Sequence, residues 1–155
     1  MLKIKLINGA KELKRGTSTS TGLDLVSLKE YKLKPMDRVL VETGVCIEPE
    51  SKIEYEDGIG IVDMQIRPRS GLSSKGIIAH LGTVDEDYRG ECKVSIINLS
   101  GEDYTIKEGD KVAQLTYGYA FIPHIQYVDK LSDSERGTSG FGSTGNWKMY
   151  KYSSN

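Results

Sequence analysis

Short β-type runs, each closed by a turn-forming residue, dominate this sequence. Residues 2–7 place Leu, Ile and Leu at alternate positions, which is the period of a half-buried strand. Further alternating or β-branched runs occupy residues 38–42, 44–47, 59–66, 92–98 and 111–117. The longest stretch with helical character, residues 71–75, predicts one turn with Ser70 as its cap and Gly76 as its end. We therefore predict an all-β fold, a sandwich, jelly roll or barrel, with at most one short helix.

The end of the chain has no such pattern. Residues 132–145 read SDSERGTSGFGSTG, a polar, glycine-rich stretch from which no packed interior can be built. The whole chain of 155 residues has the length of one ordinary domain. We predict a β-rich core over residues 1–131 and a flexible arm over residues 132–155, the arm ending in the short extension NWKMYKYSSN.

Charge and cysteine usage narrow the function classes. The 21 Lys and Arg residues nearly balance 22 Asp and Glu residues, so no global basic field favours nucleic-acid binding. No apolar run approaches the roughly 18 residues of a membrane span, and no signal peptide begins the chain. Cys46 and Cys92 lack CxxC spacing, which argues against zinc and for a reducing compartment. We expect an intracellular protein of the cytoplasm, or of the nucleus in a eukaryotic host, with no membrane partner.

One candidate anion site lies at residues 67–71, RPRSG. Here a predicted strand ends and the predicted helical turn begins. Helix N-termini attract anions, and Arg69 and the hydroxyl of Ser70 would face the same position. The alternative is that Ser70 only caps the turn and Arg69 is a solvated surface charge.

Two acidic positions are candidates for chemistry. Asp85 lies in the acidic segment of residues 82–91, which reads either as a β-hairpin with a charged tip or as the site of a general base. Asp24 is flanked by leucines, a pattern typical of a partly buried acid that needs an Arg or a hydrated metal ion as its partner. Neither His80 nor His124 lies in a nucleophile motif, and a bound metal would be Mg²⁺ held by oxygen ligands and phosphates.

The glycine-rich arm is a third candidate. Its four glycines alternate with Ser, Thr and Arg, a composition suited to wrapping phosphates with backbone N–H groups. It lacks the GKS or GKT of a P-loop, and no strand is predicted to lead into it. The alternative is a disordered tail.

Five segments, taken in order, resemble the five motifs of the homotrimeric dUTPase family. They are TGLDL at 21–25, RPRSGLSSKG at 67–76, GTVDEDYRGE at 82–91, GDKVAQL at 109–115 and RGTSGFGSTG at 136–145. The resemblance implies a jelly-roll-like fold and a homotrimer with active sites at its subunit interfaces. It also implies Mg²⁺-dependent hydrolysis of dUTP to dUMP and pyrophosphate, which lowers dUTP and supplies dUMP for thymidylate synthesis.

The resemblance also assigns roles to single residues. It implies that Asp85 activates the water that attacks the α-phosphate and that Asp24 helps to hold the hydrated Mg²⁺. The residues implied to bind the phosphates are Arg69, Ser70, Gln114, Arg136, Ser143 and Thr144. Those implied to contact the uracil and the deoxyribose are Ala79, Gly82, Val84, Asp85, Tyr88 and Phe141, with Tyr88 against the sugar and Phe141 stacked on the base.

Two other functions stay open at this point. A dCTP deaminase-like enzyme of a related fold is one, although the complete fifth motif argues against it. A nucleotide-gated module that binds a protein partner is the other, because residues 50–64 predict an enlarged loop beside the second motif and residues 146–155 add an aromatic, basic extension.

Overall fold

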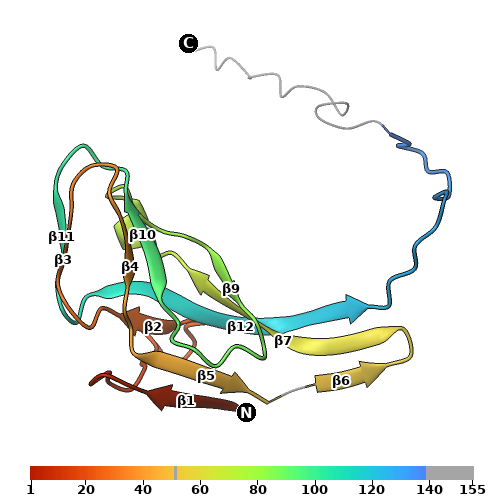
Figure 1. The fold of residues 1–155 in the computed structure, drawn as a ribbon, viewed down its shortest axis with the longest axis horizontal. Coiled ribbons are helices and arrows are strands. Elements are labelled where there is room, and N and C mark those ends of the chain that lie inside the picture. The colour runs from red at the N-terminus through yellow and green to blue at the C-terminus, as the bar shows by residue number, and fades with distance from the viewer. Residues whose placement is uncertain (51, 139–155) are drawn as a thin grey trace, which may run out of the picture. The chain divides into compact units, whose positions relative to one another are not determined.

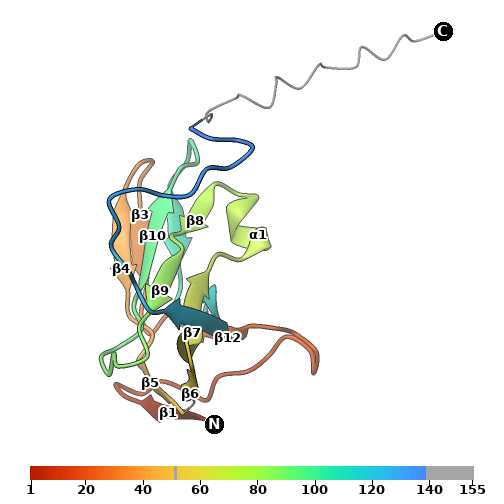
Figure 2. The same ribbon diagram turned by 90° about the vertical axis from the view of Figure 1, so that its right-hand side faces the viewer.

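The computed structural model describes residues 1–50 and 52–138. Within this range the chain forms strands and one helix of four residues (Figures 1 and 2). The elements are β1 (Leu2–Leu6), β2 (Leu23–Val26), β3 (Tyr31–Leu33), β4 (Arg38–Val41), β5 (Val45–Pro49), β6 (Lys52–Tyr55), β7 (Gly58–Arg67), α1 (Ser70–Ser73), β8 (Ile77–Ala79), β9 (Gly82–Val84), β10 (Val94–Asn98), β11 (Tyr104–Ile106) and β12 (Lys111–Pro123). The predicted all-β class with one short helix is confirmed.

The strands pair mostly with partners far away in the sequence. The largest sheet has the order β2-β12-β7-β6, and β9 pairs with a different part of β7 than β6 does. Smaller sheets are formed by β4-β10-β8, by β1-β5 and by β11-β3, and all of these pairs are antiparallel. Figure 1 shows β7 and β12 running side by side as the longest ribbons of the molecule.

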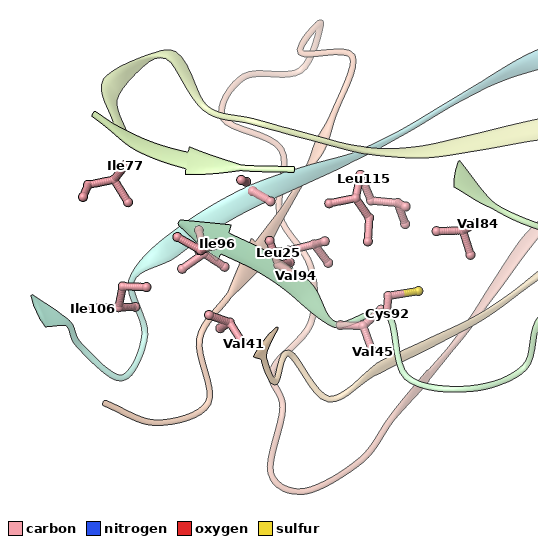
Figure 3. Close-up of a cluster of buried hydrophobic side chains, with 14 of the residues drawn as sticks. Leu25, Val41, Val45, Ile77, Val84, Cys92, Val94, Ile96, Ile106 and Leu115 are labelled. Atoms are coloured by element: carbon pink, nitrogen blue, oxygen red, sulfur yellow. The ribbon is translucent and has the colours of Figure 1, made fainter. Parts of the chain in front are cut away.

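One apolar core joins these sheets. Alternate residues point inward, as the buried positions of β5 and β10 illustrate. Leu25, Val41, Met64, Ile77 and Val94 have no measurable exposure. Figure 3 shows such side chains meeting between the ribbons, from β2 through β10 to β12. Burying each Leu, Ile or Val contributes roughly 1.5–3 kcal/mol to stability.

Two local predictions are wrong. Residues 50–64 do not form an enlarged loop, because β6 and β7 make a hairpin in which Lys52 pairs with Ile61 and Tyr55 with Gly58. The segment 82–91 is not a hairpin either: β9 pairs with β7, whereas the next strand, β10, pairs with β4 and β8. The first error missed β6, a short strand that pairs with the next strand of the chain. In the second, pairing with a strand that is not the next in sequence overrides the local pattern.

The chain divides into a compact unit, Met1–His124, and a second unit that begins at Ile125. Residues 125–138 contain neither helix nor strand. The residues Phe141, Ser143 and Thr144 of the fifth motif lie outside the described residues. The predicted boundary after residue 131 stays a prediction.

Candidate active site

A row of three residues crosses the largest sheet where β7 ends. Gln114 of β12 pairs with Asp24 of β2 on one side and with Arg67 of β7 on the other. Paired positions present their side chains on the same face of a sheet. Gln114 Nε2 also donates to the carbonyl oxygen of Pro68 at 3.3 Å, which joins β12 to the residues that follow β7.

Gly22 lets the chain approach this row closely. A Cβ atom on Gly22 would lie 2.5 Å from Oε1 of Gln114 and 2.8 Å from its Cβ, both too short for a real contact. Only glycine therefore fits between the first and fourth motifs at this position.

Asp24 is a buried carboxylate between two cations. Its side chain is 7% exposed, Arg69 Nη1 donates to Oδ1, and Lys111 Nζ lies 2.8 Å from Oδ2. Each oxygen of the Asp24 carboxylate therefore faces one cation. The prediction that Asp24 needs an Arg or a metal ion as partner is met by Arg69, which is therefore not a solvated surface charge.

The helical turn after β7 presents Ser70 to the same region. Arg69, in an extended conformation, occupies the N-cap position and Ser70 is the first helical residue. No side chain caps the helix, so the prediction that Ser70 is the cap is wrong. The first intrahelical donors are Leu72 and Ser73, both to the carbonyl of Arg69, so the N–H groups of Ser70 and Gly71 precede the intrahelical hydrogen bonds.

These elements enclose a cavity of about 600 Å³, here called the first cleft. Its cations are Arg69, Lys75 and Lys111, and its acids are Asp24 and Asp110. The full lining is Gly16, Ser20, Gly22, Asp24, Arg69, Ser70, Gly71, Leu72, Lys75, Gly109, Asp110, Lys111 and Gln114. Several donors and a small cationic excess make this a site for an anion with many oxygens.

A loop that precedes β2 forms one wall of the first cleft. Arg15 Nη1 donates to the carbonyl oxygens of Ser20 at 2.5 Å and of Thr21 at 2.8 Å. The hydroxyl of Ser20 accepts from the N–H of Thr17 at 2.9 Å. The loop is thus held by its own side chains, and it places Ser20 in the lining of the first cleft.

A second cleft, of about 360 Å³, lies along β9. It is lined by Leu40, Ile66, Gly82, Thr83, Val84, Asp85, Tyr88, Glu91, Cys92 and Lys93. Asp85 follows β9 and begins a turn that the N–H of Tyr88 closes on the Asp85 carbonyl at 3.0 Å. The second cleft therefore combines an exposed carboxylate with apolar walls and one tyrosine ring, a lining typical of small-molecule sites.

Asp85 and Arg69 lie in different clefts of the chain. The two clefts have no lining residue in common. Val84 pairs with Met64, which places Asp85 opposite Asp63 of β7. β7 continues from Asp63 to its end at Arg67, and at about 3.3 Å per residue this part of the strand is roughly 13 Å long.

Comparisons with known proteins identify the family. The dUTPase family model matches residues 8–145. The chain is 44% identical over 146 residues to the deoxyuridine 5'-triphosphate nucleotidohydrolase of Treponema denticola, covering 91% of this chain and 95% of that protein. This chain belongs to the dUTPase family.

Other members agree in sequence and in fold. The human mitochondrial deoxyuridine 5'-triphosphate nucleotidohydrolase is 39% identical over 132 residues, which are 84% of this chain and 49% of that protein. The Staphylococcus bacteriophage 80alpha dUTPase solved with dUPNHPP is 25% identical and superposes with a TM-score of 0.81, covering 94% of this chain and 99% of that one. The predicted dUTPase-like fold is confirmed by this likeness.

The structure sorts the residues predicted from the dUTPase motifs into groups. Asp24, Arg69, Ser70 and Gln114 line the first cleft. Gly82, Val84, Asp85 and Tyr88 line the second. Ala79 lines neither, because it lies in β8 with its side chain 2% exposed in the core. Arg136 lies in the second unit, next to a turn closed by the N–H of Gly137 on the Ser134 carbonyl at 3.0 Å.

Lys111, Ser20 and Glu91 are among the residues that line the two clefts but were not predicted from the sequence. Lys111 lies within the quoted fourth motif, where a cation three residues before Gln114 was a usable signal. The loop of residues 16–21 was visible as a Ser- and Thr-rich stretch bounded by glycines. Glu91 ends the third motif, and nothing in the sequence indicated what its carboxylate binds.

Within the described residues, no helix is long and apolar enough to cross a membrane. Cys46 and Cys92 are both free thiols. Burial, with smaller effects of Cys46 and Glu91, raises the pKa of the Cys92 thiol to about 11. The Cys92 thiol is therefore protonated and unreactive at neutral pH.

Proposed function

We propose that this chain hydrolyses dUTP to dUMP and pyrophosphate, the activity named for its curated relatives. The observation that carries the proposal is the first cleft, in which the buried Asp24 holds Arg69 beside the helix start at Ser70. A family match over residues 8–145 supports assigning this cleft to the triphosphate. Near-neutral net charge is no obstacle, because the cations are concentrated where the phosphates would bind.

The first cleft suits the phosphates for electrostatic reasons. Arg69, Ser70 and Gln114 would donate to phosphate oxygens, and these donors are already in place before substrate arrives. Asp24 keeps the guanidinium of Arg69 oriented without neutralising the whole cleft, since Lys75 and Lys111 also line it. Preorganised donors of this kind stabilise negative charge that develops on the leaving pyrophosphate.

The residues of the first cleft also fit a hydrated Mg²⁺. In the described part of the chain, no group of three or more His, Cys, Asp or Glu side chains could hold a metal directly. Asp24 Oδ2 lies 2.8 Å from Lys111 Nζ, and a carboxylate oxygen has a second lone pair with which it would accept from a metal-bound water. When bound, Mg²⁺ would supply positive charge that offsets the charge of the phosphates and of the leaving pyrophosphate.

The second cleft would hold the nucleoside and the attacking water. Asp85 would take a proton from a water molecule as that water attacks the α-phosphate. The ring of Tyr88 would lie against the deoxyribose, and the backbone at Gly82 and Val84 would face the uracil edge. The location of Ala79 in the core limits it to a backbone contact.

A complete site would then need more than one subunit. One chain keeps Asp85 and Arg69 in separate clefts, whereas the α- and γ-phosphates of one dUTP are only a few ångströms apart. Placing the second cleft of one subunit against the first cleft of another would bring both onto one substrate. We propose the homotrimer of the family as the assembly that does this.

The C-terminal arm would close the site, with Arg136, Ser143 and Thr144 on the γ-phosphate and Phe141 on the uracil. We expect a chain ended after Glu135 to melt within a few degrees of the full chain, because every residue of the apolar core precedes it. Its hydrolysis of dUTP should fall to background. Thermal melts and pyrophosphate release measure the two effects; a melting temperature that fell along with the activity would contradict a lid role.

A substrate panel tests the proposed activity. We expect pyrophosphate release from dUTP with Mg²⁺, with little from dCTP, dTTP or UTP. Ammonia release from dCTP would instead identify the deaminase alternative. An absence of pyrophosphate release from dUTP by the full chain would refute the proposal.

A further inference from the structure

We propose that Glu91 is a positioning residue that fixes the Tyr88 wall of the second cleft and thereby sets the preference for a 2′-deoxyribose. This inference rests on the proposed function, which places the sugar against Tyr88. It concerns a residue that contacts no reacting atom and acts through its neighbours.

The carboxylate of Glu91 is bound by a backbone turn. Oε1 accepts from the N–H of Thr43 at 2.9 Å and from the N–H of Gly44 at 2.8 Å. The Glu91 side chain is only 11% exposed, with Lys93 Nζ 3.6 Å from Oε2. Charge-assisted bonds to two amides from a nearly buried carboxylate are among the stronger hydrogen bonds in a protein.

The segment that Glu91 binds is closely packed. Gly44 has a φ of +66°, and a Cβ there would lie 2.5 Å from the carbonyl oxygen of Ile7. The hydroxyl of Thr43, which is fully buried, donates to the carbonyl of Cys92 at 2.7 Å. Glu91 is therefore fastened to a fixed part of the core between β4 and β5.

Tyr88 is in turn hydrogen-bonded to Glu91. The Tyr88 hydroxyl donates to the backbone carbonyl of Glu91 at 3.1 Å. Its ring packs on Gly90, where a Cβ would lie 2.3 Å from the hydroxyl oxygen, so only glycine permits this position. Glu91 therefore links the Tyr88 ring to the core and fixes the position of the ring, although Tyr88 is 45% exposed.

A fixed ring discriminates sugars better than a mobile one. To reject a ribose, the Tyr88 ring must keep its position when a 2′-hydroxyl is brought against it. A tyrosine without this anchor would move aside at a small cost in free energy. Loss of the Glu91 anchor should therefore raise the relative use of UTP.

The test is the ratio of kcat/KM for dUTP to that for UTP. We expect Glu91→Ala to lower this ratio by about tenfold or more, and Glu91→Gln, which keeps the Oε1 acceptor, to change it by less than about threefold. Glu30→Ala is the matched control: it removes an exposed carboxylate that lines neither cleft and should leave the ratio unchanged. General destabilisation would lower both rates together and leave the ratio intact.

A double-mutant cycle separates positioning from independent effects. Tyr88→Phe, which removes only the hydroxyl, should also lower the ratio, and adding it to Glu91→Ala should lower the ratio no further. If Glu91→Ala does not fold, Glu91→Asp decides, because the shorter carboxylate cannot keep both amide bonds and the ratio must still fall. An unchanged ratio in a folded Glu91→Ala or Glu91→Asp chain overturns the inference, whereas a wild-type chain inactive on dUTP overturns the proposed function.

Discussion

Asp85→Asn should lower the turnover of dUTP by roughly 10² to 10⁴-fold, the range expected when a general base is lost. The amide keeps the shape of the side chain but cannot accept the proton of the attacking water. Because Asp85 is exposed at the turn after β9 and makes no ion pair among the described residues, folding should be unaffected.

The matched control is Asp87→Asn. Asp87 lies in the same turn, is also exposed and does not line the second cleft. Stopped-flow or steady-state pyrophosphate release gives kcat, and titration with a non-hydrolysable dUTP analogue gives the dissociation constant. Full turnover by Asp85→Asn, or an equal loss in Asp87→Asn, would remove Asp85 from the role of base.

Mixing two inactive variants should restore activity if each site is shared between subunits. Asp85→Asn damages the second cleft and Arg69→Gln the first, so a mixed trimer contains sites with one intact cleft from each parent. For random exchange of equal amounts, we expect about a quarter of the wild-type sites to be restored. Each variant alone should stay near background, so the expected rise is large.

The control for this experiment mixes Asp85→Asn with Tyr88→Ala. Both changes lie in the second cleft, which one subunit provides whole, so no mixture contains an intact site. Mass spectrometry of differently tagged subunits verifies that exchange took place. Exchange without recovery in the Asp85 and Arg69 pair would mean that each site is built within one chain.

Part of the fold could be predicted from the sequence because it depends on the properties of neighbouring residues. The alternation at residues 2–7 and the β-branched run at 59–66 each became a strand, β1 and β7. The turn at residues 70–73 became α1, with Gly76 at a φ of +76° just after it. Three-residue strands such as β8 and β9 were not predicted, because three residues are too few to show an alternating pattern.

The candidate site was predicted residue by residue but not in its arrangement. A leucine-flanked Asp24 indicates a buried acid in need of a partner, and that partner proved to be Arg69, 45 positions away. The acidic run around Asp85 gave the wrong local structure, since β9 joins β7 and not the strand that follows. Lys111 lies beside Asp24, and two backbone amides lie beside Glu91, because distant strands pair in one particular register.

The amino-acid sequence was enough to establish the all-β class, the single helical turn and the five motifs that mark the dUTPase family. Those properties rest on side-chain period, backbone preference and residue identity, all of which are local. The folded chain, by contrast, places Asp24 between two cations in one cleft and Asp85 in another, and it brings the Glu91 carboxylate against two backbone amides. Pairing between distant strands sets these distances, and many registers are compatible with the same local pattern.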